Sequence, residues 1–352
     1  MAWEKKLIPV TELKPGMMSS EDVIFEDKML LSKNNIVTKP TIDKLKQNYL
    51  VDKIEVYVKN DSDSPLIIKT NTIQKIENDF NEFSLSLKRI FNNISKLKVP
   101  EMNEIRIFSK KIQEEFKSTG IVIRNIVFYG SGNDTIYRHS INVSAISFIL
   151  GKWLNFSQRE LNLLTYSAIL HDFGKTKISK DIINKTGALT PKEYKIFKNH
   201  PIIGYKFIKS IPYLDPSVGY GVLMHHEKID GSGYPLGITG DKIHAFAKII
   251  AIADLFDAVN SSKYHKKVRG PFEALRIIQE QSLEKLDCKY CSVFLNHIIN
   301  YFMGENVLLN NGKKCKVIQV QINDLTNPLL LSEDNFLDLR KEKDLYVEKL
   351  II

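Results

Sequence analysis

The chain has 352 residues, of which 43% are hydrophobic and 26% charged, and its formal net charge is +9. This length and composition predict a folded protein of two or three domains and exclude a disordered chain. Its lysines and arginines are scattered, without the interleaved aromatic side chains of a nucleic-acid platform, so the charge favours a small phosphate ligand or a solvated surface over a nucleic-acid polymer. No apolar run approaches the ~18 residues of a membrane span and the N-terminus lacks the apolar segment of a signal peptide, so we expect a cytoplasmic protein.

Residues 1–65 are predicted to form a small α+β domain. Short β-type runs surround a turn signal at Pro15, and residues 39–50 have the pattern of a short helix. Residues 51–58 then alternate apolar and polar side chains, as a strand does. The polar segment 60–65, NDSDSP, has the composition of a linker.

The chain is mostly helical in pattern from this linker onward. Residues 66–120 are helical and heavily charged, and two interpretations stay open: a coiled connector, or the first helices of the next domain. Residues 121–303 carry apolar side chains at three- and four-residue spacing, which predicts a helical domain. Residues 304–352 change to β-type runs around a hairpin signal at Asn311-Gly312. The predicted fold class is therefore mainly α, a helical bundle preceded by the small α+β domain and followed by a short β-rich C-terminal segment.

The three cysteines do not form a convincing metal or redox site. Cys288 and Cys291 make a C-x-x-C pair, while Cys315 stands alone. A zinc site would need a second pair, and a redox site would need a βαβ setting. Because the segment around the pair reads as a helix, we expect buried helix cysteines.

Histidines and aspartates are grouped in the helical region, next to predicted helix ends. Imidazoles and carboxylates on rigid helices suit a divalent metal ion, and Asp254 lies in an apolar helix, where an unpaired carboxylate would be costly. Taken singly, each histidine could be an ordinary hydrogen-bonded residue, which is the expectation for His244, His265 and His297. Together, the others predict a metal centre built from His139, His171, Asp172, His200, His225, His226 and Asp254.

Five motifs carry these residues: RHS at 138–140, HDFGK at 171–175, NHPIIG at 199–204, HHEKIDGSGYP at 225–235 and AIADLFDAV at 251–259. Their order and spacing resemble the HD-GYP family of HD-domain phosphodiesterases over roughly residues 125–300. Residues 1–65 are also similar to the small domain often found ahead of HD-GYP domains. The resemblance implies an HD-domain helical bundle for residues 121–303.

The resemblance further implies two divalent metal ions, iron or manganese, bridged by Asp172. The implied ligands are His139, His171 and Asp254 on one side and His200 with His225 on the other, with His226 beside them. Family members with three ions carry a glutamate four residues before the first histidine, and here that position is Thr135. The neighbouring Asp134 has an offset that directs it elsewhere on a helix, so two ions are expected rather than three.

The family hydrolyses the bacterial messenger cyclic di-GMP, to linear pGpG or onward to GMP, and the resemblance implies this activity here. A water activated by the ions would attack phosphorus in line while a lysine holds the phosphate. Asp172 and Lys175 are the implied catalytic residues. The implied substrate-binding residues are Lys175, Gly233, Tyr234, Pro235, Tyr264 and Lys266.

One segment departs from the family pattern. Residues 261–267 read SSKYHKK where the family has a sequence like D-R-P-Y-R-K, so an arginine fork is replaced by lysine. Affinity or selectivity for cyclic di-GMP could therefore differ from the family norm, with the metal chemistry retained.

Two alternative functions stay open. An HD phosphohydrolase for another nucleotide is one, although plain HD domains lack the HHEKIDGSGYP block. A module that binds cyclic di-GMP or docks a protein partner without turnover is the other, and the altered segment 261–267 is its best support. A homodimer through the charged helices of residues 72–118 and protein partners in signalling are further expectations, whereas a membrane or a nucleic-acid polymer is not expected.

Overall fold

The computed structural model describes residues 4–10, 13–25, 28–47, 53–58, 65–96, 102–116, 119–132, 134, 136–185, 187–261, 268–333 and 335–351. The predictions for Thr135, Tyr264 and Lys266 lie outside these residues, as does the predicted linker apart from Pro65. No helix among the described residues combines the length and hydropathy that crossing a lipid bilayer requires.

The N-terminal unit has the predicted α+β composition. Strands β1 (Glu4–Pro9), β5 (Lys53–Val58) and β2 (Met18–Ser19) form an antiparallel sheet in that order. Strands β3 (Val23–Phe25) and β4 (Lys28–Leu31) pair as a separate hairpin, and α1 is Lys39–Gln47. The unit encloses a small core of its own, made of Val10, Leu13, Val23, Leu31, Val37, Ile42, Leu45, Ile54 and Val56.

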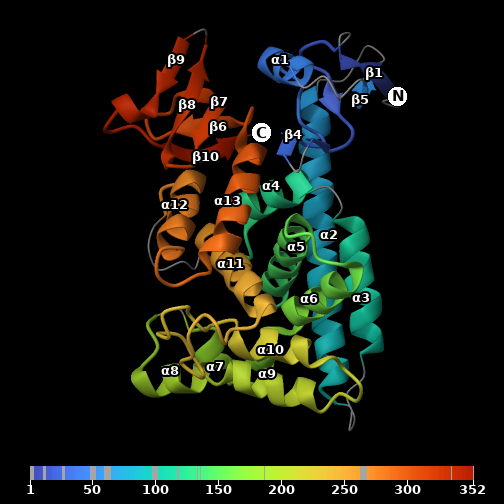
Figure 1. Ribbon diagram of the computed structural model, residues 1–352, viewed down its shortest axis with the longest axis vertical. Helices are drawn as coiled ribbons and strands as arrows, with labels where there is room; N and C mark the ends of the chain where they lie inside the picture. The colour runs from blue at the N-terminus through green and yellow to red at the C-terminus, as the bar shows by residue number, and fades with distance from the viewer. Residues whose placement is uncertain are drawn as a thin grey trace.

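Two charged helices link this unit to the bundle and pack as part of it. Helix α2 (Pro65–Ile94) runs from the N-terminal unit along the side of the bundle, and α3 (Asn103–Glu115) lies beside it (Figure 1). Phe80 of α2 stacks on Phe116 with ring centroids 4.3 Å apart, and Phe91 belongs to the same large core. Of the two interpretations of residues 66–120, this packing favours the first helices of the helical domain.

The helical domain continues with eleven short and long helical segments among the described residues. They are α4 (Thr119–Tyr129), α5 (Tyr137–Trp153), α6 (Gln158–Leu170), η2 (Phe173–Lys177), α7 (Lys180–Ile183), α8 (Pro191–Phe197), α9 (His200–Lys209), α10 (Pro216–Met224), α11 (Ala245–Asn260), α12 (Pro271–Gln281) and α13 (Cys288–Phe302). Helix α5 is buried from Arg138 to Gly151, so it forms the centre of the bundle. The mainly α fold class is confirmed.

The C-terminal segment is a five-stranded antiparallel sheet in the order β10-β6-β7-β8-β9. Its elements are β6 (Asn306–Leu309), β7 (Lys314–Gln321), β8 (Asp324–Ser332), β9 (Asn335–Asp338), η3 (Leu339–Lys341) and β10 (Val347–Ile351). The predicted hairpin joins β6 to β7, and Gly312 has φ +83°, a conformation that favours glycine. Val307 and Val317 extend the helical core into the sheet, so the segment packs on the bundle.

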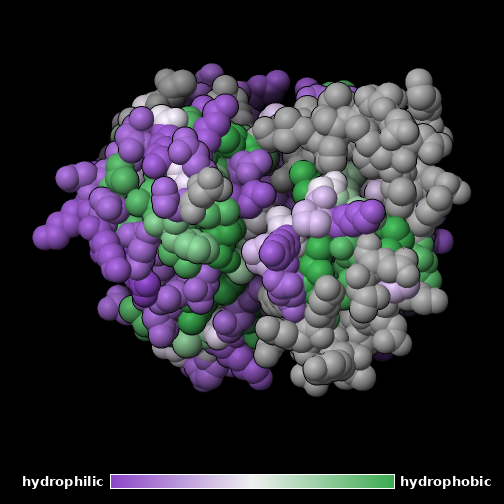
Figure 2. Space-filling model, turned by 90° about the horizontal axis from the view of Figure 1, so that it is seen from above, coloured by the Kyte–Doolittle hydropathy of each residue, from purple (hydrophilic) through white to green (hydrophobic). Residues whose placement is uncertain are grey.

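The sheet and the N-terminal unit lie at the same end of the molecule (Figure 1). Seen from that end, hydrophobic patches alternate with hydrophilic side chains (Figure 2). The cysteine expectation is half right: Cys291 in α13 is buried, but Cys288 at the start of that helix is exposed. The expectation of a buried Cys288 is wrong because the first turn of α13 faces solvent.

Candidate metal centre

Seven side chains from five segments converge on one buried point. His139 lies in the first turn of α5, and His171 and Asp172 end α6. The others are His200 at the start of α9, His225 and His226 directly after α10, and Asp254 in α11. Their ligand atoms form two groups, each with all atoms within 4.8 Å of one another: His139, His171 and Asp254, and Asp172, His200, His225 and His226.

Asp172 lies between the two groups. Its Oδ2 is 3.5 Å from His139 Nε2 and 3.4 Å from His171 Nε2. Its Oδ1 is 3.3 Å from His200 Nε2 and 3.9 Å from His225 Nε2. One carboxylate therefore presents an oxygen to each group, which is the arrangement of a bridging ligand.

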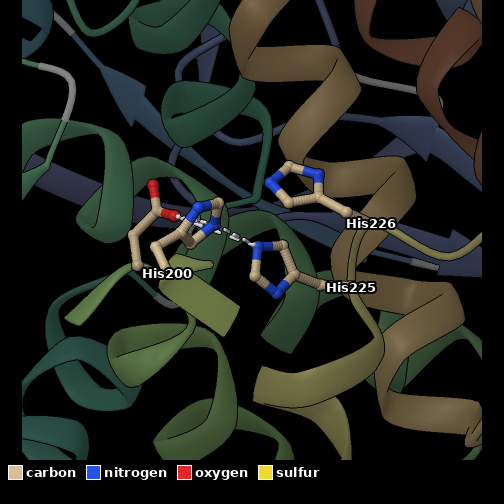
Figure 3. A group of neighbouring side chains, drawn as sticks. His200, His225 and His226 are labelled. Carbon is tan, nitrogen blue, oxygen red and sulfur yellow. Dashed lines mark hydrogen bonds and ion pairs between the residues drawn. The ribbon is translucent and has the colours of Figure 1, made fainter. Parts of the chain in front are cut away.

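Backbone carbonyls fix the tautomer of three of the histidines. The Nδ1–H groups of His171, His200 and His225 donate to carbonyl oxygens of the preceding turn, at 2.7, 2.8 and 2.7 Å. In the neutral ring this leaves an unprotonated Nε2 that faces the centre. Two of these atoms, on His200 and His225, lie only 3.3 Å apart (Figure 3). Two lone pairs at this distance repel each other, so the arrangement calls for a cation.

Burial and nearby charge set the protonation states. Burial lowers the pKa of His200, and it lowers the pKa of His225 and His226 well below the usual value, so these rings are neutral at pH 7. Burial alone would raise the pKa of Asp172, but the positive charge of Lys175 and the contact with His171 hold it well below its usual range. The centre thus combines carboxylate and neutral imidazole donors.

His139 differs from the other rings. Although burial opposes its charged form, hydrogen bonds to Asp254 and Asp257 raise the pKa of His139 to about 10. Its Nε2 lies 3.1 Å from Asp254 Oδ1 and its Nδ1 2.7 Å from Asp257 Oδ2. A divalent cation and the Nε2 proton therefore compete for the same position.

The donor set fits divalent metal ions. Asp172 Oδ1 and His226 Nε2 are buried and find no hydrogen-bond partner of good geometry among the described residues. Such orphaned atoms are costly unless something binds them. Mixed imidazole and carboxylate donors suit iron, manganese or zinc, and five of the seven donor residues are buried, with His226 and Asp254 partly exposed.

Comparison with known proteins agrees with this chemistry. An HD-domain family model matches residues 123–289, which include all seven side chains. The cyclic di-GMP phosphodiesterase PA4108 of Pseudomonas aeruginosa is 28% identical over 204 residues, which are 58% of this chain and 49% of that protein. The 3'3'-cGAMP-specific phosphodiesterase 3 of Vibrio cholerae is 30% identical over 168 residues, 47% of this chain and 36% of that protein. This chain contains an HD domain of the HD-GYP family.

A solved structure shares the fold of the HD-GYP domain and of the chain segments next to it. Bd1817, an HDG"Y"P protein from Bdellovibrio bacteriovorus, has a TM-score of 0.50 and 18% identity and covers 83% of this chain and 98% of its own. The chain spans about half the length of the curated relatives it matches first.

Two close approaches hold the HD-GYP centre together. A Cβ on Gly174 would come within 2.0 Å of the His200 carbonyl oxygen, so only glycine lets η2 lie against α9. A Cβ on Gly233 would meet backbone atoms of Glu227 and Lys228 at 2.3 to 2.6 Å. Both positions need glycine for space, since neither has a positive φ.

The loop of residues 227–238 covers one side of the HD-GYP centre. Glu227, which the sequence analysis did not single out, is buried and accepts hydrogen bonds from the backbone N–H groups of Leu236 and Ile238, at 2.6 and 3.2 Å. Tyr234 stacks on His226 with ring centroids 4.7 Å apart. Of the predicted substrate-binding residues, Gly233, Tyr234 and Pro235 thus lie beside the centre.

Lys175 also lies at the centre, as predicted. Its Nζ is 2.5 Å from Asp172 Oδ2, and its side chain is only 10% exposed. The sequence analysis also predicted that Asp134 is directed away from the centre, and the structure agrees. Asp134 precedes α5, however, instead of lying on it. There its carboxylate accepts hydrogen bonds from the N–H groups of Ile136, Tyr137 and Arg138 and caps the helix that carries His139.

A buried polar network behind His139 was not anticipated from the sequence. Asp257 accepts a second hydrogen bond from Asn142 Nδ2 at 2.5 Å, and Asn142 Oδ1 accepts from Arg138 Nε at 3.1 Å. Arg138 in turn donates to Glu77 of α2. The RHS motif pointed to Arg138, but no local signal marked Glu77.

Proposed function

We propose that this chain is a metal-dependent phosphodiesterase that hydrolyses cyclic di-GMP to linear pGpG, with GMP as a possible further product in bacterial second-messenger signalling. The observation that carries the proposal is Asp172 between two groups of buried imidazole and carboxylate donors, with the Lys175 ammonium against it. A pair of metal ions is a recurrent arrangement for phosphodiester hydrolysis, and these residues would hold such a pair. The names of several relatives support the choice of substrate.

The proposed cofactor is a pair of iron or manganese ions. His139, His171 and Asp254 would hold one ion and His200, His225 and His226 the other, with Asp172 shared. When bound, the ions supply positive charge to the phosphate and acidify a water molecule. His226 is included because it belongs to the second group and its buried Nε2 finds no hydrogen-bond partner among the described residues.

The chain's own residues then bind and orient the substrate. The Lys175 ammonium is placed to pair with a phosphate oxygen, since it is buried and already directed into the centre by Asp172. Gly233, Tyr234 and Pro235 would line the substrate cleft, with the edge of the Tyr234 ring left for contact with a base or ribose, since His226 stacks on the ring and Lys198 lies over it. Tyr264 and Lys266 stay proposed contacts.

A second nucleotide substrate is the main alternative. Relatives of comparable identity are named as 3'3'-cGAMP-specific phosphodiesterases, and the unusual SSKYHKK segment bears on base selection. A module that binds without turnover is the other alternative, and the full set of donor side chains argues against it. A cytoplasmic location, a homodimer and protein partners stay predictions.

The test is a product assay with anaerobically purified protein loaded with Fe²⁺ or Mn²⁺. Cyclic di-GMP, 3'3'-cGAMP and cyclic di-AMP are supplied separately, and products are resolved by chromatography. A His171→Ala, Asp172→Ala double variant excludes contaminating enzymes. Preferential formation of pGpG or GMP by the intact protein supports the proposal. A preference for 3'3'-cGAMP means that this nucleotide is the substrate instead of cyclic di-GMP. No turnover at full metal content means that the chain binds a ligand or partner without cleaving it.

A further inference from the structure

Lys198 holds its ammonium group between two aromatic rings beside the centre. Its Nζ lies 4.8 Å from the centroid of the Tyr194 ring and 4.9 Å from that of Tyr234. Both distances are within the ~6 Å over which a cation is attracted to a ring face. The two rings come from different segments, α8 and the loop of residues 227–238, so contacts with both segments define the position of the ammonium.

This ammonium lies one aromatic layer outside the metal centre. The Tyr234 ring stacks on His226 with an interplanar angle of 28° and meets His200 edge-on at 6.5 Å. Lys198 itself ends α8, two residues ahead of His200. The succession His226, Tyr234, Lys198 and Tyr194 thus leads from the centre outward, and Tyr194 at its far end is 47% exposed.

Lys175 and Lys198 both lie near the centre, but only the Lys175 ammonium is paired with a carboxylate of the described residues. Lys175 is tied to Asp172 and its Nζ lies 5.3 Å from the Phe197 ring centroid, so it belongs to the inner layer. Lys198 forms no ion pair with any carboxylate in the part of the chain that the structure describes. Its charge is therefore positioned by ring faces alone and stays available to an anionic ligand.

We propose that Lys198 binds the second phosphodiester of a cyclic dinucleotide while the metal centre and Lys175 engage the phosphodiester that is cleaved. The inference rests on the proposed function and deepens it. A cyclic dinucleotide carries two phosphodiesters in one ring. A site with positive charge only at the metal centre and Lys175 would leave the negative charge of the second phosphodiester without a cationic partner. The Tyr194–Lys198–Tyr234 cage places a cation next to the substrate loop at low entropic cost, because the long side chain is already held.

The test compares two substrates that differ in the number of phosphodiesters. Cyclic di-GMP has two, whereas bis(p-nitrophenyl) phosphate has one and reports on the metal centre alone. Lys198→Met keeps the length and apolar packing of the side chain but removes its charge. We expect this variant to raise the KM for cyclic di-GMP about tenfold, as for a lost charge-assisted hydrogen bond, with kcat changed by less than about twofold.

The same variant should hydrolyse bis(p-nitrophenyl) phosphate as the unaltered protein does and bind the same amount of Mn²⁺. Lys198→Arg should recover most of the affinity. The matched control is Lys195→Met on the exposed face of α8, which should leave the KM and kcat for both substrates unchanged. Tyr194→Leu, which removes one wall of the cage, should raise the KM for cyclic di-GMP by a smaller factor.

Equal losses on both substrates would overturn the proposal, because they would mean that Lys198 only supports the Tyr234 loop. An unchanged KM would overturn it as well. If the unaltered protein cleaves only bis(p-nitrophenyl) phosphate, the proposed function fails, and inhibition of that reaction by cyclic di-GMP becomes the readout. Inhibition weakened by Lys198→Met then upholds the subsite, and equal or absent inhibition rejects it.

Discussion

Arg138 of α5 and Glu77 of α2 form a two-point ion pair behind the metal centre. Arg138 Nη2 lies 2.7 Å from Glu77 Oε2, and Nη1 lies 3.3 Å from Oε1, with the two side chains 6% and 15% exposed. Through Asn142 and Asp257 this pair reaches the Nδ1 of His139. The long helix that follows the N-terminal unit is therefore connected by hydrogen bonds to a proposed metal ligand.

Removing the carboxylate of Glu77 should weaken metal binding. Glu77→Gln leaves the Arg138 charge buried without its partner and loosens the support of His139. We expect a Kd for Mn²⁺ raised about tenfold, since loss of a group behind a ligand commonly costs 10- to 100-fold. Loss of the buried pair should also destabilise the fold by about 3 kcal/mol. Calorimetric titration with Mn²⁺ and thermal unfolding measure the two effects.

The control for this variant is Glu82→Gln, at an exposed position of the same helix. It should leave both the Kd for Mn²⁺ and the melting temperature unchanged. If Glu77→Gln lowers the melting temperature but not the metal affinity, the network stabilises the bundle without positioning His139.

Metal binding should release a proton from His139. Because its pKa is raised to about 10 without metal, the ring is protonated at neutral pH, and a cation must displace that proton. Lowering the pH raises the concentration of protons that compete with the metal ion for His139 Nε2, so metal binding becomes weaker. Calorimetric titrations at pH 7.5 in buffers of different ionisation enthalpy should report about one proton released for the ion bound at this group.

His244→Ala serves as the control, because this histidine caps α11 and lies outside both donor groups. It should release the same number of protons as the unaltered protein. Metal affinity that is independent of pH between about 6 and 8 would contradict the assigned protonation state.

The sequence predicted the parts of the fold and site that local patterns encode. The resemblance of five motifs to the HD-GYP family implied that His171, His200 and His225 belong to one metal centre, and each of them lies at a helix end. The α+β unit, the helical region and the C-terminal hairpin also followed from periodicity and turn residues. The packing of residues 66–120 did not, since a charged helix with a narrow apolar face suits a connector equally well.

Contacts between distant segments were beyond such patterns. Glu77 pairs with a residue 61 positions later, and its surroundings resemble any solvated helix face. Lys198 likewise stood among other lysines, and only the folded loop places Tyr234 over it. Both depend on the tertiary arrangement of α2, α8 and the 227–238 loop, which no single-sequence period describes.

The two cysteines of the C-x-x-C pair should differ strongly in reactivity. Cys288 is exposed, whereas burial raises the pKa of the Cys291 thiol to about 12. Iodoacetamide at pH 8 should therefore label Cys288 rapidly and Cys291 only on unfolding. Mass spectrometry of digested peptides measures the two rates, with Cys315 as the buried reference. Equal labelling of Cys288 and Cys291 in the folded protein would contradict the exposed start of α13 and the burial of Cys291.

Gly174→Ala should disrupt the metal centre from within the HDFGK motif. The added Cβ would lie 2.0 Å from the His200 carbonyl oxygen and must push η2 away from α9, and this displacement separates Asp172 from His200. Overpacking of this kind commonly costs about 1–3 kcal/mol. We expect a lower melting temperature and a clear loss of bound Mn²⁺, measured by elemental analysis after gel filtration.

Gly187→Ala is the matched control, since a Cβ there meets nothing within 4 Å and the residue is exposed. It should retain both stability and metal content. If Gly174→Ala folds and binds Mn²⁺ as tightly as the unaltered protein, then η2 and α9 can move apart without cost. The bridging position of Asp172 would then depend on its own side chain instead of on this close backbone contact.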